Sequence, residues 1–147
     1  MKIYDCFIYF DEELLLDVRL NILNKFVDKF VIVESRFSHR GEARNPNFNI
    51  KKFEKFKDKI EYILLDENPN NLFTIDKNDK LINEKIIING NLREFYQRNS
   101  ILHGLKNAED EDLIIISAKF KGSLSVKEDI EKKQSDYIDR KKISQPS

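Results

Sequence analysis

The sequence of 147 residues predicts an α/β fold with a mostly parallel sheet, on the basis of two observations. Four short segments consist almost entirely of leucine, β-branched or aromatic residues, as is typical of strands buried on both faces. Between them lie stretches whose apolar residues are three and four positions apart, the spacing of a helix that packs on a sheet. This alternation of strands and helices indicates one layered α/β domain.

The first strand is predicted over residues 3–10, which read Ile-Tyr-Asp-Cys-Phe-Ile-Tyr-Phe. A helix of about four turns should follow, because acidic residues that suit the positive end of a helix dipole precede an apolar stretch at helical spacing. The apolar residues of this helix are Leu14, Leu15, Val18, Leu20, Ile22 and Leu23. Residues 30–33, Phe-Val-Ile-Val, form the second strand and complete a βαβ unit.

A polar segment follows the second strand and leads to the third. Residues 36–47 contain Gly41 and Pro46 and show no periodicity, so we expect a loop there. A short helix over residues 51–59 should then precede a third strand over residues 60–65.

The second half of the chain is less regular. Residues 86–91 read as a short strand and turn or as the edge of an insertion, and Asn91 or a neighbour could cap a helix over residues 92–105. Residues 113–117 are almost uniformly apolar, so we expect a central strand. Residues 118–147 are nearly all polar, which predicts a divergent tail that is loosely helical or disordered.

Composition narrows the class of protein. Charged residues make up 35% and hydrophobic residues 40%, and the formal net charge is zero, which argues against a nucleic-acid-binding protein. The single cysteine, Cys6, lies in an apolar run, so no disulfide forms within the chain, as is typical of a reducing compartment. No apolar run approaches the ~20 residues that span a bilayer, and no signal peptide is recognisable. We therefore expect a cytoplasmic protein without a membrane span.

The candidate site follows from the direction of the strands. In open parallel sheets ligands bind at the carboxyl ends of the strands, which here are followed by Phe10 and Glu12 and by Glu34 and Ser35. An acid such as Glu34 can accept hydrogen bonds from a ribose or a base edge. The alternative is that Glu34 caps the following loop or pairs with Arg36.

Further polar residues should lie near the same edge of the sheet. Asp66 and Glu67 follow the third strand. Arg93 and Arg98 lie five positions apart on the helix that precedes the last strand, so that one can face a diphosphate while the other faces solvent.

Two separated blocks of the sequence resemble glycosyltransferase family 17. The first is YDCFIYFDEELLLDVRLNILNKFVDKFVIVESRFSHRG, residues 4–41. The second contains Tyr-Gln-Arg-Asn at residues 96–99, Ile-Leu and Gly-Leu at residues 101–105, and Asp-Leu-Ile-Ile-Ile-Ser at residues 112–117. The blocks occur in the order found in the family, and the resemblance extends over residues 3–117 with a looser region at residues 66–90.

The resemblance implies a fold of the GT-A type, in which residues 1–117 would be the Rossmann-like half that binds a nucleotide sugar. It implies a UDP-sugar donor and transfer of a hexosyl group to a glycan, since family members add a bisecting β-1,4-N-acetylglucosamine to N-glycans. Catalytic residues stay unassigned. The residues expected to hold the nucleotide are Phe10, Glu12, Glu34, Ser35, Gly41, Gln97 and Arg98.

The metal-binding motif of the family is missing. In the family the last strand runs into an Asp-x-Asp motif, whose carboxylates hold Mn²⁺ or Mg²⁺ against the donor diphosphate. Residues 118–120 here are Ala-Lys-Phe, so no metal ligand is predicted. The Asp-Glu-Asp at residues 110–112 precedes the strand and is interpreted as a solvated turn. In the alternative interpretation, Lys119 or Lys121 replaces the charge of the metal.

We therefore expect a glycosyltransferase-like protein that is truncated and weakly active or inactive. A frameshift, a truncation, a genuine rearrangement or a sequencing error would each explain the departure after Ser117. The alternatives are a non-catalytic remnant that still binds nucleotide and a small α/β interaction module. Because half of a GT-A domain leaves apolar surface uncovered, self-association through the exposed sheet surface is also expected.

Overall fold

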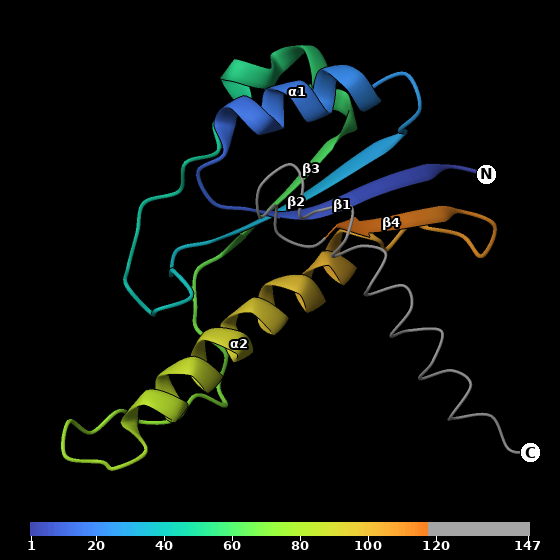
Figure 1. Ribbon diagram of the computed structural model, residues 1–147. Coiled ribbons are helices and arrows are strands. Elements are labelled where there is room, and N and C mark those ends of the chain that lie inside the picture. The colour runs from blue at the N-terminus through green and yellow to red at the C-terminus, as the bar shows by residue number, and fades with distance from the viewer. Residues whose placement is uncertain (118–147) are drawn as a thin grey trace, which may run out of the picture. The chain divides into compact units, whose positions relative to one another are not determined.

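A computed structural model describes residues 1–117, which form one of the two units into which the chain divides, Met1–Ser117 and Ala118–Ser147. The predicted polar tail therefore lies outside the described residues. Figure 1 shows the order of the elements along the chain. They are β1 (Ile3–Tyr9), α1 (Glu13–Leu23), β2 (Lys29–Ser35), the 3₁₀ helix η1 (Ile50–Lys59), β3 (Ile60–Leu65), α2 (Ile82–Ser100), the 3₁₀ helix η2 (Ile101–Gly104) and β4 (Leu113–Ser117).

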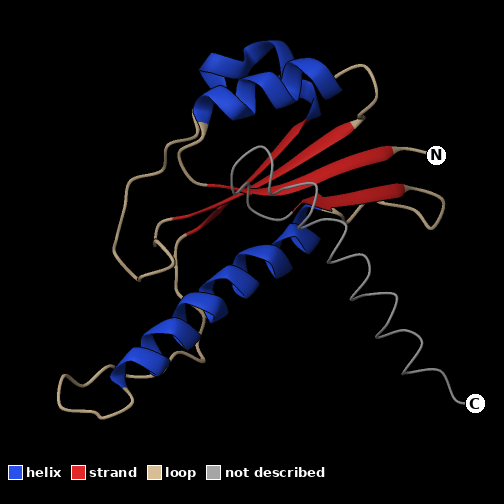
Figure 2. Cartoon of the chain, in the orientation of Figure 1, coloured by secondary structure: helices blue, strands red, loops and turns tan. Residues whose placement is uncertain are grey.

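The strands form one parallel sheet in the order β3-β2-β1-β4. Cys6 in β1 lies opposite Val31 in β2 and Ile116 in β4, which fixes the register of the three strands. Helices α1 and η1 cover one face of the sheet, and α2 lies on the other (Figure 2). The predicted α/β class with a parallel, Rossmann-like sheet is confirmed.

Each face of the sheet has its own apolar core, because successive side chains of a strand point to opposite faces. Phe7 and Tyr9 of β1 pack with α1 and η1, whereas Cys6 packs on the opposite face with the side of α2 and η2. The first core comprises Phe7, Tyr9, Leu16, Leu20, Val27, Phe30, Ile32, Phe53 and Phe56. The second core comprises Tyr4, Cys6, Val31, Val33, Leu65 and Ile101.

Helix α1 is present as predicted, but most of the residues expected to form its buried face are exposed. Leu16 and Leu20 are its buried residues, whereas Leu14 is 77% exposed. The cause is a buried ion pair: Arg19 Nε and Nη2 donate to the carboxylate of Asp5, at 2.7 and 2.5 Å. Because this pair turns Arg19 toward β1, the helix presents Leu14, Leu15, Val18 and Ile22 to solvent.

Helix α2 contradicts the prediction of a strand and turn at residues 86–91 and of a cap at Asn91. The helix runs without interruption from Ile82 to Ser100. Its first half is held by buried Asn89, whose side-chain amide forms two hydrogen bonds with the backbone of Phe73, at 2.7 and 2.9 Å. This tertiary contact outweighs the preference of consecutive isoleucines for a strand.

Among the described strands, β4 lies at the edge of the sheet, where the sequence predicted a central strand. Its one neighbour among the described strands is β1. The four apolar side chains of β4, from Leu113 to Ile116, are 38–54% exposed, although their uniform apolarity is typical of a strand covered on both faces. No helix in residues 1–117 is long and apolar enough to cross a membrane.

Candidate functional site

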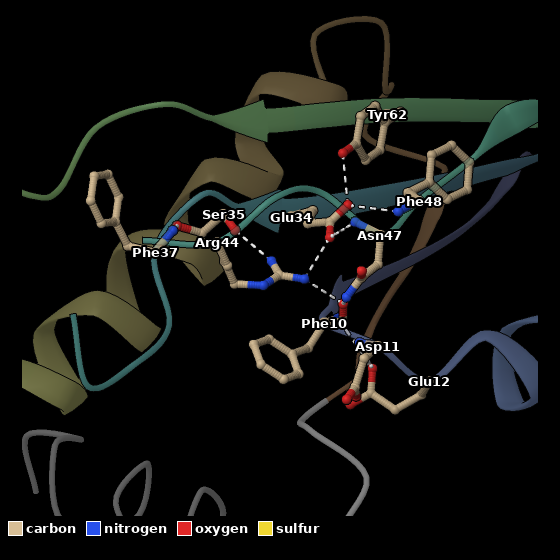
Figure 3. A network of polar contacts seen from close by, with 10 residues as sticks. All are labelled: Phe10, Asp11, Glu12, Glu34, Ser35, Phe37, Arg44, Asn47, Phe48 and Tyr62. Carbon is tan, nitrogen blue, oxygen red and sulfur yellow. Dashed lines mark hydrogen bonds and ion pairs between the residues drawn. The ribbon is translucent and has the colours of Figure 1, made fainter. Parts of the chain in front are cut away.

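The carboxyl ends of the four strands meet at one edge of the sheet, because all strand pairs are parallel. Two loops lie there side by side. One follows β1 and contains Phe10, Asp11 and Glu12, and the other follows β2 and extends over residues 36–49. Figure 3 shows that the second loop returns to the end of β2 and places Arg44 and Asn47 beside Phe10.

Glu34 is completely buried, and its carboxylate anchors this second loop. Oε2 accepts hydrogen bonds from Arg44 Nη2 at 2.8 Å and from the backbone N of Asn47 at 2.7 Å. Oε1 accepts from the backbone N of Phe48 at 3.0 Å and from Tyr62 Oη at 2.8 Å. Four internal donors therefore occupy Glu34, which supports the interpretation that it caps the loop. It pairs with Arg44.

The predicted partner Arg36 pairs elsewhere. Arg36 Nε lies 2.5 Å from the carboxylate of Asp66, which follows β3, and both side chains are exposed. The Glu34 carboxylate instead accepts a hydrogen bond from Tyr62 of β3, which lies two positions before Leu64, the register partner of Glu34. Burial, and then the hydrogen bond to Glu34, raise the pKa of Tyr62 well above its ordinary value, so the phenol stays protonated as a donor.

Arg44 joins the ends of β1 and β2, and sequence reasoning missed it. Its Nη1 donates to the carbonyl oxygen of Ser35 at 2.5 Å, and its Nη2 donates to that of Phe10 at 2.6 Å. The guanidinium also lies over the Phe10 ring, 4.3 Å from the ring centroid. One side chain thus fixes both strand ends. A polar loop that contains several arginines carries no signal that would single out Arg44.

The turn after β1 is stabilised by the side chain of Glu12, which lies within it. Glu12 Oε2 accepts hydrogen bonds from the backbone N of Phe10 at 3.1 Å and of Asp11 at 3.2 Å. Asn47 Nδ2 donates to the Phe10 carbonyl at 2.7 Å. The carboxylate of Glu12 therefore shapes the turn before α1, while the Phe10 ring stays 37% exposed at the edge of the site.

A second group of polar residues connects the β2 loop to α2. Gln97 is buried, and its Oε1 lies 2.8 Å from His39 Nε2. Arg93 Nη1 donates to the carbonyl of His39 at 3.0 Å, and its Nε donates to Asn68 Oδ1 at 2.9 Å. Gly41 has a φ of +89°, and a Cβ there would lie 2.5 Å from Arg93 Nη2. The backbone conformation therefore favours glycine here, and a Cβ would also displace the end of the Arg93 side chain.

The structure thus gathers the predicted site residues into two groups and leaves one apart. Phe10, Glu12, Glu34 and Ser35 surround Arg44, and Gly41 and Gln97 surround Arg93 and His39. Arg98 belongs to neither group, because it pairs with Glu94 one turn earlier on α2. That the predicted site residues hold a nucleotide stays a prediction.

No set of three histidine, cysteine, aspartate or glutamate side chains within residues 1–117 could hold a metal ion. The acidic turn before β4 has another use. Asp112 accepts hydrogen bonds from the backbone N of Lys2 at 2.7 Å and of Glu109 at 2.9 Å, and these donors lower its pKa. The turn lies at the amino end of β4, away from the site. Within the described part of the chain, the His, Cys, Asp and Glu side chains therefore do not form a ligand set for Mn²⁺ or Mg²⁺.

Comparison with models of protein families matches residues 1–120 to glycosyltransferase family 17. The matched range contains all the described residues and both sequence blocks that resemble this family. Searches of curated proteins and of solved structures gave no match.

Proposed function

Because this chain belongs to glycosyltransferase family 17, we propose that residues 1–117 bind the nucleotide of a nucleotide-sugar donor at the carboxyl edge of the sheet. The observation that carries the proposal is the buried Glu34–Arg44 pair, which fixes the loops after β1 and β2. A site whose loops are ordered before binding loses less entropy when the ligand binds. This half would correspond to the donor half of a GT-A fold.

The Phe10 ring is the contact that we assign to the nucleotide base. Phe10 is 37% exposed, and its ring contacts the Arg44 guanidinium. An aromatic ring in a fixed position offers a stacking surface for a planar base, at about 1–3 kcal/mol per base. Arg44 acts as a positioning residue, because its donors are directed at the backbone of Phe10 and Ser35.

We infer that the donor is a UDP-sugar such as UDP-N-acetylglucosamine, with a glycan as acceptor, in line with the family. We expect this chain to transfer the sugar weakly or not at all, since Ala-Lys-Phe at residues 118–120 stands where the family has metal-binding acids. Those residues lie outside the described structure. The cytoplasmic location stays a prediction.

Calorimetry with UDP tests the binding proposal, and Phe10→Ala should weaken the affinity about tenfold, as expected for the loss of one stacked base. Phe26→Ala is a matched control, since Phe26 is also an exposed aromatic ring beside a cation, that of Lys25. No binding of UDP, or an equal loss in both variants, would overturn the proposal. Manganese-dependent turnover of UDP-N-acetylglucosamine that a chelator abolishes would contradict the expected inactivity.

A role as an interaction module is the second candidate, favoured by the apolar side chains on the surface. Within residues 1–117, β4 is an edge strand with four exposed apolar residues, and edge strands of this kind can pair with another strand. We propose self-association through β4. Light scattering after size exclusion should detect dimers that Ile115→Lys converts to monomers, whereas Leu14→Lys on α1 should leave them intact. A monomer at all concentrations would contradict this proposal.

A further inference from the structure

The guanidinium of Arg93 is partly buried and lacks a countercharge among the described residues. Arg19, Arg36, Arg44 and Arg98 each pair with a carboxylate. Arg93 instead bonds only to neutral oxygens, those of Asn68 and His39. Burial alone lowers the pKa of Arg93, with no acid offsetting it. A cation taken from water without an opposite charge is unfavourable, so an anion at this position would stabilise the domain.

Three of the N–H donors of Arg93 have no acceptor among the described residues. An arginine has five N–H donors, of which Nε and one on Nη1 are occupied here. Gly41 packs beside the guanidinium, since a Cβ on Gly41 would lie 2.5 Å from Nη2, so the lack of a side chain at Gly41 leaves room for Arg93 in this position. His39 and Asn68 belong to the segments after β2 and β3, so the Arg93 guanidinium lies near the carboxyl ends of these strands.

We propose that Arg93 is an anion-binding residue and that it holds the diphosphate of the nucleotide donor. The planar guanidinium matches the spacing of phosphate oxygens, and its bonds to a charged group are stronger than neutral ones. Arg93 would thereby supply positive charge beside the diphosphate from within residues 1–117, where no metal-binding cluster is found. The inference rests on the proposed function, since it assigns one part of the donor to one residue.

Titration calorimetry in the presence of a chelator tests the inference with UDP, uridine and inorganic pyrophosphate. Arg93→Gln should lower the affinity for UDP and for pyrophosphate by about tenfold or more, as expected for a lost bond to a charged group, and leave uridine unchanged. Lys57→Gln is the control, because Lys57 is an exposed cation outside the candidate site and already has Glu54 as its partner. It should change each affinity by less than about twofold.

The outcomes separate the inference from the proposed function. If Arg93→Gln binds UDP as tightly as the wild type does, the diphosphate assignment is overturned while nucleotide binding stands. If pyrophosphate binds through Arg93 but UDP does not bind, the anion site stands and the proposed function fails. If neither ligand binds to the wild type, both are wrong.

A measurement on the wild-type protein covers the case in which the variant does not fold. Phenylglyoxal modifies accessible arginines, and mass spectrometry of the peptides reports the extent at each position. Pyrophosphate should protect Arg93 and leave the modification of exposed Arg40 unchanged. Equal modification of Arg93 with and without pyrophosphate would overturn the inference.

Discussion

Replacement of Glu34 by glutamine removes the charge from the anchor of the β2 loop while keeping its size. Glutamine offers one oxygen in place of two. In the better orientation this oxygen stays on Arg44 and the backbone N of Asn47, while the new amide donates to Tyr62 Oη. The N–H of Phe48 then faces another N–H, and the buried Arg44 loses its countercharge.

The expected loss of stability follows from these two changes. A buried donor left without an acceptor costs about 1–3 kcal/mol, and removal of one partner of a buried ion pair costs about 3–5 kcal/mol in total. Glu34 is 0% exposed, so solvent cannot compensate. We therefore expect Glu34→Gln to lower the free energy of unfolding by about 3–5 kcal/mol, a large share of the roughly 5–15 kcal/mol of a typical domain.

Urea unfolding followed by circular dichroism measures this loss. The control is Glu13→Gln, which breaks the Glu13–Lys52 ion pair of 2.9 Å between two exposed side chains. A pair of this kind contributes about 0–1 kcal/mol, so the control should stay close to the wild type. If Glu34→Gln were no less stable than Glu13→Gln, the argument that Glu34 anchors the loop would be refuted.

Three further predictions concern the two cores. Gly104→Ala should lower the free energy of unfolding by about 1–3 kcal/mol in urea titrations, because its Cβ would lie 2.5 Å from Val31 Cγ1. Gly90→Ala should lower stability less, since its Cβ would lie 3.3 Å from the backbone oxygen of His39 and needs only a small shift. Burial raises the pKa of Cys6 to about 12, so a thiol reagent near neutral pH should label Cys6 only after unfolding, and fast labelling of the native protein would contradict this. Burial raises the pKa of Tyr9 from 10.0 to about 12, and it raises the pKa of Cys6 from 9.0 to about 12. Because both pKa values are raised in the folded state, their stabilising contribution is complete below pH 9 and is lost as the pH rises toward 12, which urea midpoints across this range would detect.

The strands were predictable because their sequences are dominated by β-branched and aromatic residues, and β1, β2 and β3 lie where the pattern places them. The errors have tertiary causes that no local pattern contains. The rotation of α1 depends on the Arg19–Asp5 pair, and the first half of α2 depends on the contact of Asn89 with Phe73. These contacts join residues 14 and 16 positions apart.

The location of the site was predictable from the sequence, but the hydrogen bonds and ion pairs within it were not. The rule for parallel sheets placed Phe10, Glu12, Glu34 and Ser35 at one edge, and the structure brings them together. The role of Arg44 could not be predicted, because it depends on how the β2 loop folds back on its own strand. The same holds for Arg93: its missing countercharge is visible only once the partners of the other arginines are known.

The pairing of β4 with β1 has a consequence for how the chain folds during synthesis. The first 65 residues contain β1, β2 and β3, which are consecutive in sequence and adjacent in the sheet, so this part can assemble early. The contact between Lys2 and Asp112 closes a separation of 110 residues and must come late, since long loops are slow to close. During synthesis on the ribosome, the edge of β1 that pairs with β4 therefore stays without its partner until translation has passed residue 117.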